Sequence, residues 1–179
     1  SLRGDRAGGD AQLERARQLG WFAAPWLQSG WTFADGDREG AASQFEQYTS
    51  RFRDLDPATA KAVELLVSTL RDASRGPEFL AAAKVAPGNF AGMGWSSWLV
   101  FVGMNDEAMI VASDQGRLDP DTLRVVWSPT ARAVLSSPKY LELAAPSGLI
   151  EYWDARGYPE GCRVVDAPER YLDCTERWR

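Results

Sequence analysis

The sequence predicts an all-α fold of paired helices. Through most of the chain, apolar residues recur at the spacing that places them on one face of a helix. Proline, glycine and helix-capping residues interrupt this pattern at intervals typical of short helices. Because no stretch clearly alternates apolar and polar residues between turns, an isolated strand would have no partner. We therefore expect antiparallel helical hairpins.

The first two helices are expected on either side of a glycine. Asp10 can cap a helix that runs to about Gly20 and keeps its apolar residues on one face. Pro25 suits the first turn of the next helix, because a first-turn residue needs no amide hydrogen. The Asp-Gly-Asp turn at residues 35–37 ends this second helix.

Two longer helices are expected next. Residues 38–53 form the clearest amphipathic pattern, with large apolar side chains along one face. Asp56 and Pro57 then provide a helix cap and a first helical residue, and the pattern continues until Gly76-Pro77. A short alanine-rich helix is predicted from Glu78 to Val85.

The segment from Phe90 to Met104 has two interpretations. Its centre, Trp98–Val102, is aromatic and β-branched and could be a buried strand. A helix is the better prediction, because a strand here would leave its backbone groups unpaired. Asn105 then caps a helix at residues 106–115, whose acidic first turn suits the helix dipole.

Beyond Pro120 the expected elements become shorter. One or two turns are predicted at residues 121–127, and Ser128-Pro129 and Ser137-Pro138 each resemble a cap followed by a first-turn proline. A last helix is expected from Gly148 to Arg156, where Gly157 ends it. From Tyr158 onward we expect an ordered but irregular strap.

Composition excludes several classes of function. The 179 residues carry a formal net charge of -5 and no basic cluster, which disfavours nucleic-acid binding by this segment. The longest apolar run, Trp98–Met104, is far shorter than the ~20 residues of a membrane span, so no membrane insertion is expected. The chain contains no histidine, which excludes a Ser-His-Asp triad and histidine-bound zinc. No phosphate-binding glycine motif is present, and we expect no cofactor.

Carboxylate pairs are the remaining candidates for chemistry. They occur at Asp35/Asp37, Asp106/Glu107 and Asp119/Asp121, and such pairs can serve as acid and base or bind calcium. Each pair sits at a predicted helix boundary. Helix capping is therefore the better explanation, and an enzyme is not expected.

Two segments of the chain repeat one pattern. In residues 89–122, Trp95 and Leu99 occupy the large-residue positions of a tetratricopeptide unit and Ala108 its small position. In a unit that begins near Phe22, Ser29 takes the small position of the first helix, and Ala41 and Phe45 match the second helix. The match is partial, since Ser96 replaces the usual glycine and Ala112 a bulky residue.

The C-terminal quarter strengthens this resemblance. It contains Trp127-Ser-Pro, Ser137-Pro-Lys-Tyr140, Gly148-Leu-Ile-Glu-Tyr-Trp153, Gly157-Tyr-Pro-Glu-Gly-Cys162 and Asp173-Cys174. In this order the motifs resemble the end of bacterial tetratricopeptide-like proteins, of the kind found in winged-helix transcriptional regulators and adenylate-cyclase-like signalling proteins. The resemblance implies a helical-hairpin array at residues 10–126 and a C-terminal cap of the same domain at residues 127–179. Residues 1–9, which include no initiator methionine, are expected to be a disordered tail or the processed end of a longer protein.

The same resemblance bears on the two cysteines. The similar proteins share both Cys162 and Cys174, and the strap that carries them has few apolar residues of its own. A disulfide is therefore expected, and it would indicate an oxidising compartment, hence the periplasm. The alternative is two buried thiols in a cytoplasmic protein.

The repeat alignment also predicts a groove on the first helix of each unit. Its lining residues would be Trp26, Phe33, Phe90, Met93, Val100 and Phe101. Most aromatic side chains of a helical domain pack in the core, which is the competing interpretation. If the groove exists, it would accept a protein segment or a small apolar ligand.

These observations predict a non-catalytic, helical-repeat binding domain. We expect it to be the sensor or scaffold part of a larger bacterial signalling or regulatory protein. The alternative is a structural domain that self-associates, as a homodimer or within an envelope complex. The sequence names no specific partner.

Overall fold

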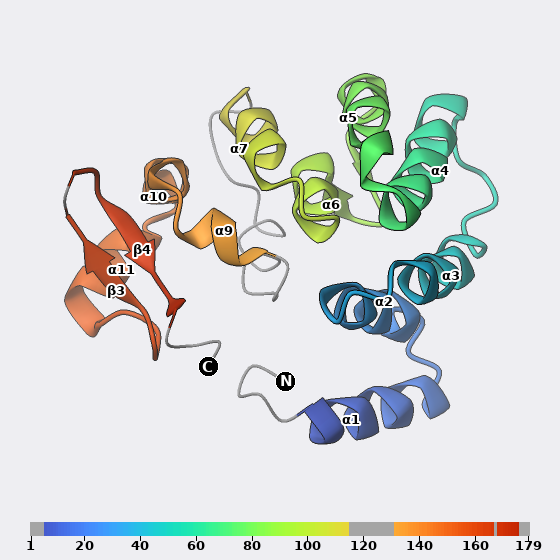
Figure 1. Cartoon of the computed structure of the whole chain (residues 1–179), viewed down its shortest axis with the longest axis horizontal. Helices are drawn as coiled ribbons and strands as arrows, with labels where there is room; N and C mark the ends of the chain where they lie inside the picture. The colour runs from blue at the N-terminus through green and yellow to red at the C-terminus, as the bar shows by residue number, and fades with distance from the viewer. Residues whose placement is uncertain (1–5, 115–130, 167, 176–179) are drawn as a thin grey trace. The chain divides into compact units, whose positions relative to one another are not determined.

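The computed structural model describes residues 6–114, 131–166 and 168–175. These residues belong to two compact units, unit 1 (Ser1–Pro87) and unit 2 (Gly88–Arg179), and each is described by itself (Figure 1). In the described residues of both units, helices predominate and the strands form two small sheets. The predicted all-α class is confirmed. The expected turns at residues 121–127 and the Trp127 and Ser128-Pro129 motifs lie outside the described residues.

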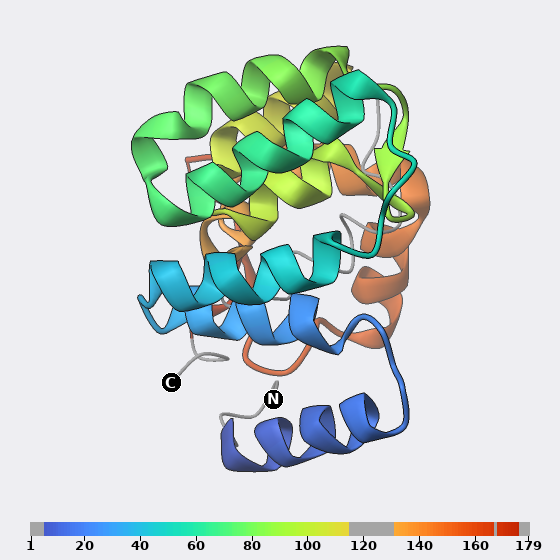
Figure 2. The same ribbon diagram turned by 90° about the vertical axis from the view of Figure 1, so that its right-hand side faces the viewer.

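Unit 1 consists of helices that follow one another through short connections (Figure 2). Their bounds are α1 Arg6–Gln18, α2 Ala24–Ala34, α3 Arg38–Thr49, α4 Pro57–Arg71, the 3-10 turn η1 Ala73–Arg75 and α5 Gly76–Val85. In sequence order α2 packs on α3, α3 on α4, and α4 on α5. The largest fully buried side chains of these helices are Phe45, Leu66, Leu70 and Phe79. Unit 1 is thus a set of antiparallel hairpins, as predicted.

Capping residues set most of these boundaries. The Asp56 carboxylate accepts hydrogen bonds from the amides of Ala58 and Thr59, both at 3.0 Å, so the predicted start of α4 is confirmed. The end is different, because α4 stops at Arg71 and Pro77 lies in the first turn of α5. Proline fits a first turn, since that position needs no amide donor, and the predicted stop at Gly76-Pro77 is therefore the start of the next helix.

Ser29 sits where α2 crosses α3. Its hydroxyl is buried and donates to the Ala41 carbonyl oxygen at 2.7 Å. Ala41 itself is fully buried, so both helices present a small residue at the crossing and their backbones can approach closely.

Unit 2 begins with a short β-hairpin and continues with helices. Its elements are β1 Asn89–Phe90, β2 Met93–Gly94, α6 Trp95–Phe101, α7 Asn105–Asp114, α9 Arg132–Leu135, α10 Pro138–Ala144, the 3-10 turn η3 Ala145–Ser147, α11 Leu149–Arg156, β3 Arg163–Val165 and β4 Tyr171–Asp173. The helical interpretation of Trp98–Val102 is confirmed by α6. The predicted last helix is also confirmed, since α11 ends at Arg156 with Gly157 as its cap.

The α6/α7 hairpin of unit 2 repeats the α2/α3 hairpin of unit 1. In each, a fully buried serine lies on the first helix and a fully buried alanine on the second, at Ser29 and Ala41 and at Ser96 and Ala108. In each, a glycine with positive φ follows the first helix, at Gly36 (φ 89°) and Gly103 (φ 81°). The serine, glycine and alanine keep the same spacing in both hairpins, which agrees with the repeat read from the sequence.

Two hairpins of strands were not predicted. In the first, Phe90 pairs with Met93 across Ala91 (φ 54°) and Gly92 (φ 82°), and two positive φ angles in a two-residue loop form a type I′ turn. In the second, β3 pairs antiparallel with β4, with Val164 opposite Leu172. The strap expected beyond Tyr158 is thus not wholly irregular. Leu172 is fully buried and β4 packs on α10, which explains why this segment becomes ordered.

Candidate binding surface

The structure contradicts four residues of the predicted groove. Phe90, Met93, Val100 and Phe101 are at most 5% exposed and belong to the core of unit 2. The β1–β2 hairpin accounts for Phe90, because it places this ring 5.4 Å from Trp98 and 6.4 Å from Trp95. Trp98 also donates its indole N–H to the Phe90 carbonyl oxygen at 3.1 Å. These side chains cannot line an open groove in this conformation.

The same packing explains Val100 and Phe101. Every residue of α6 is buried, so this helix has no solvent-facing side on which a groove could form. Phe101 meets Trp98 edge to face, with ring centroids 5.8 Å apart. The repeat alignment places these residues on a helix correctly, but helical phase alone cannot tell a fully buried helix from one with a free face.

Trp26 and Phe33, the two predicted residues in unit 1, are half-buried on α2. The guanidinium carbon of Arg38 lies 4.9 Å from the Phe33 ring centroid, so a cation–π contact covers part of this ring. Trp26 instead lies near Tyr48, at a centroid distance of 6.5 Å. Of the predicted set, Trp26 is therefore the residue that leads to a surface cluster.

That cluster is centred on Tyr48 and contains Phe22, Trp26 and Phe52. We call these four residues, together with Trp21, which precedes Phe22 in the sequence, the aromatic patch. The Tyr48 ring stacks on Phe22 at 6.3 Å and meets the edge of Phe52 at 5.3 Å. Beneath them, Phe45 lies 5.7 Å from Tyr48 and belongs to the core of unit 1. The patch is thus continuous with the core at one end and reaches the surface at the other.

Exposure distinguishes the patch from an ordinary core. Tyr48 is 3% exposed, whereas Trp21 is 43% and Phe22 is 53% exposed. Leu19, two residues before Trp21, is 80% exposed. Three large apolar side chains within four consecutive residues therefore face solvent, and grouped apolar exposure of this kind marks interaction surfaces more often than isolated residues do.

Backbone hydrogen bonds hold the exposed residues in place. The Trp21 amide donates to the Ala16 carbonyl oxygen and the Gly20 amide to the Arg17 carbonyl oxygen, both at 2.9 Å. This pair of bonds is the Schellman motif that ends many helices, and it ties Trp21 to the last turn of α1. At the other side, the Phe52 amide donates to the Thr49 carbonyl oxygen at 2.9 Å, just beyond α3. The aromatic patch is therefore presented by ordered backbone.

Two arginines, Arg71 on α4 and Arg38 on α3, hold these helices together, and α3 carries Tyr48. Arg71 forms a two-point ion pair with Glu46, at 2.9 and 2.8 Å, and a longer contact with Glu39. In return, Arg38 on α3 donates to the carbonyl oxygens of Thr69 and Arg71 at the end of α4. Hydrogen bonding to Arg71 lowers the pKa of the Glu46 carboxyl. Burial raises the pKa of the Tyr48 phenol to about 12, so this ring is neutral near pH 7.

Comparison with known protein families, curated proteins and solved structures gives no match. The chemistry of the chain itself must therefore indicate its function. The described residues contain no group of three or more carboxylate or cysteine side chains placed to hold a metal ion. Among the described helices, none has the length and apolar character needed to cross a bilayer.

The described members of the carboxylate pairs lie at helix boundaries. Asp37 caps α3 by accepting from the Gly40 amide at 2.9 Å, and Asp106 and Glu107 lie in the first turn of α7. Asp119 and Asp121 lie outside the described residues. Capping or the helix dipole explains Asp37, Asp106 and Glu107, whereas Asp35 lies at the C-terminal end of α2.

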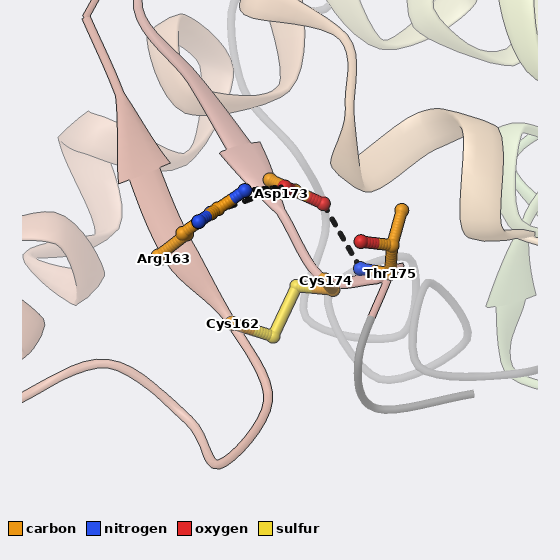
Figure 3. The surroundings of a disulfide bond; sticks show 5 residues. All are labelled: Cys162, Arg163, Asp173, Cys174 and Thr175. Atoms are coloured by element: carbon orange, nitrogen blue, oxygen red, sulfur yellow. Dashed lines mark hydrogen bonds and ion pairs between the residues drawn. A yellow bond between two sulfur atoms is a disulfide. The ribbon is translucent and has the colours of Figure 1, made fainter. Parts of the chain in front are cut away.

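The two cysteines form the expected bond. Cys162 and Cys174 are joined in a disulfide directly beyond the first residue pair of the β3–β4 hairpin (Figure 3). On the adjacent pair, the Arg163 guanidinium contacts the Asp173 carboxylate at 3.1 Å, and Asp173 also accepts from the Thr175 amide at 3.0 Å. The hydrogen bond from Thr175 and the nearby Arg163 lower the pKa of the Asp173 carboxyl. The disulfide therefore closes the open end of the hairpin.

Sequence reasoning missed Phe22, Tyr48 and Phe52 as members of the aromatic patch. Tyr48 and Phe52 fit one face of the predicted helix at residues 38–53, but α3 ends at Thr49 and leaves Phe52 in the following turn. A signal was present in Leu19-Gly-Trp-Phe22, where large apolar residues accompany a helix-ending glycine. Loop residues of this kind have no helical face to be buried on.

Proposed function

We propose that this chain is a non-catalytic, helical-hairpin domain that binds a segment of a partner protein at the aromatic patch. The observation that carries the proposal is the exposure of Phe22, whose ring stacks on the buried Tyr48, and of the neighbouring Trp21. Aromatic side chains with one accessible face give a large apolar contact at a small cost in side-chain entropy. They are also the residues that most often dominate binding energy at interfaces.

The contacts that hold the aromatic patch in place support a binding role for it. Trp21 is tied to α1, Tyr48 is held by the core, and α3 is held to α4 by arginine contacts. Preorganised contacts lower the entropy lost on association. A partner segment would therefore meet side chains that are already placed.

We also propose that the domain belongs to a larger protein in an oxidising compartment. The repeated α2/α3 and α6/α7 hairpins support a tetratricopeptide-like array, and the C-terminal motifs point to the sensor or scaffold part of a larger bacterial protein. A disulfide at Cys162 and Cys174 favours an oxidising compartment such as the periplasm over the cytoplasm.

Selection from a displayed random-peptide library tests the proposed function. The full chain is the bait, and the Phe22→Ala and Trp21→Ala variants are compared with Tyr152→Ala. Tyr152 is a matched control, because it is an exposed aromatic residue on α11 of unit 2. We expect enriched peptides whose binding is lost in the two patch variants and kept in the control.

Peptides that bind all variants equally would contradict binding at the aromatic patch. A selection that enriches no peptide would contradict it as well. Sedimentation at increasing concentration covers the alternative of self-association, because a monomer–dimer equilibrium that Phe22→Ala abolishes would assign the patch to a second copy of the chain.

A further inference from the structure

The disulfide joins two strands that are held in unit 2 in different ways. β4 packs on α10 and α9, and its Leu172 and the following Cys174 are 0% and 2% exposed. Among the described elements, β4 is the one with which β3 makes extensive contact, and Val164 and Val165 of β3 are half-buried. β4 therefore belongs to the core of unit 2, whereas β3 is attached to that core through β4 and the disulfide.

The ion pairs next to β3 involve exposed arginines. Arg163, whose side chain is 72% exposed, contacts Asp173 at 3.1 Å. In the loop between the strands, Arg170 contacts Asp154 at 3.2 Å and Asp166 at 3.5 Å, and these three side chains are at least 47% exposed. Such pairs add little to stability, because solvent and salt screen them. The pairing of a three-residue strand is also weak by itself, so the disulfide is the strongest link between β3 and β4.

The two sulfur atoms differ in their access to solvent. Cys162 is half-buried and directly follows the turn at residues 160–161, whereas Cys174 is buried at the end of β4 (Figure 3). In thiol–disulfide exchange a thiolate attacks one of the two sulfur atoms, and access decides which one reacts. An external thiolate can therefore reach Cys162 in the folded protein more easily than Cys174.

We propose that this disulfide is a redox-sensitive clip, which a dithiol reductant opens at Cys162 and which then releases β3 while β4 stays in the core. The clip goes beyond the proposed function, because the aromatic patch has no part in it. A thiolate of the reductant attacks the Cys162 Sγ and forms a mixed disulfide, and Cys174 leaves as a thiolate that takes up a proton. The second thiol of the reductant attacks this mixed disulfide, so the reductant becomes a disulfide and Cys162 is released and protonated.

Opening the clip changes the surface of unit 2 without unfolding it. The buried Leu172 keeps β4 on α10, so the packing of the helices is retained. The edge of β4 that paired with β3 loses its backbone partners, and such an edge can pair with another strand. Unit 2 would thus have a closed form under oxidising conditions and an open form in the presence of a dithiol.

Trapping of the mixed disulfide tests the site of attack. The folded full chain is treated briefly with glutathione, free thiols are blocked with N-ethylmaleimide, and mass spectrometry locates both groups. We expect glutathione on Cys162 and maleimide on Cys174 in most of the trapped protein. The same treatment in urea is the control, because both sulfur atoms are then accessible and both products should form. Glutathione on Cys174 as often as on Cys162 in the folded chain, or a bond that reacts in urea alone, would overturn the inference.

Amide hydrogen exchange tests which part of unit 2 opens. After reduction with dithiothreitol, the amides of β3 should exchange at least about tenfold faster, because their pairing with β4 is lost. Those of α10 should stay clearly slower than in the urea-unfolded chain, and Cys162→Ser/Cys174→Ser should match the reduced chain without reductant. Loss of all protection in α10 would mean that unit 2 unfolds as a whole, and unchanged exchange in β3 would mean that the bond does not hold this strand. Either result would overturn the clip and leave peptide binding at the aromatic patch to its own test.

Discussion

Ala91 occupies a backbone conformation that other residues adopt more easily. Its φ of 54° lies in the left-handed region, where an alanine side chain costs roughly 1–2 kcal/mol, and it holds the first turn position of the β1–β2 hairpin. Type I′ turns favour asparagine or glycine at this place.

We predict that Ala91→Asn and Ala91→Gly stabilise unit 2 by about 0.5–1 kcal/mol, because they relieve this conformational cost. Urea denaturation measures the change. The matched control is Ala81→Gly on the exposed side of α5, where the same substitution should destabilise by about 1 kcal/mol. A loss of stability in both positions would show that Ala91 is not in the left-handed region.

Arg71 and Glu46 couple stability to pH. The pKa of Glu46 is lowered in the folded state, chiefly by its hydrogen bonds from Arg71, from an ordinary value of 4.5. Its stabilising contribution is therefore present above about pH 4.5 and is lost as the pH falls through the lower, folded-state pKa.

We predict that Arg71→Met destabilises the protein by about 1 kcal/mol near pH 7 and by less at an acidic pH below the lowered pKa of Glu46, where this carboxyl is protonated in both proteins. Urea denaturation of the two proteins at both pH values gives the comparison. Arg156→Met, at an exposed arginine without this pairing, should show no such pH dependence. A destabilisation by Arg71→Met of equal size at both pH values would contradict the coupling of stability to the protonation of Glu46.

At the scale of elements, the crossing of α2 and α3 depends on a small residue. Ser29 is fully buried and donates to the Ala41 carbonyl oxygen. We predict that Ser29→Ala costs about 1 kcal/mol through the lost hydrogen bond, whereas Ser29→Leu costs about 3 kcal/mol because the helices must move apart.

Ser43 gives the matched control for this prediction. It lies on the exposed side of α3, so Ser43→Leu should change stability by less than about 0.5 kcal/mol. Thermal or urea unfolding measures all three variants. Equal losses of stability in Ser29→Leu and Ser43→Leu would contradict the close approach of α2 and α3 at Ser29.

The C-terminal hairpin depends on its disulfide. β3 and β4 are three residues long each, and such short strands are weakly stable by themselves. We predict that Cys162→Ser/Cys174→Ser lowers the stability of unit 2 by about 3 kcal/mol and that a reductant has a similar effect on the natural chain alone. Amide hydrogen exchange in β4 and α10 measures it; two titratable thiols in untreated protein would contradict the bond.

Helix boundaries could be predicted from the sequence where one residue has one physical role. Asp56 followed by Pro57 starts α4, and Gly157 ends α11, because capping and backbone freedom act locally. The β1–β2 turn could not be predicted, because Ala91 occupies the position at which asparagine is typical of a type I′ turn. The β3 and β4 strands are too short for an alternating pattern to be recognised.

The candidate site could be predicted less well than the fold. The repeat phase selected Trp26, which is half-buried, but it also selected Phe90 and Val100, which are buried. Burial depends on which elements pack against a helix, and a single sequence contains no direct record of that. The exposed Phe22 lies outside any helix, where periodicity carries no information.

At the scale of the whole molecule, the two units differ in what they offer. Unit 1 combines a packed hairpin stack with the aromatic patch, whereas unit 2 carries the buried aromatics of α6 and the disulfide-closed hairpin. The proposed partner binding therefore belongs to unit 1. Unit 2 would serve as the structural end of the array, in keeping with the need of helical repeats for a terminal cap.

Amide hydrogen exchange of the full chain, with and without a saturating selected peptide, tests partner binding by unit 1 most directly. Bound peptide should slow exchange at residues 19–26 and 45–53, because these segments form the aromatic patch, and leave α11 unchanged. Protection confined to unit 2 would contradict the assignment.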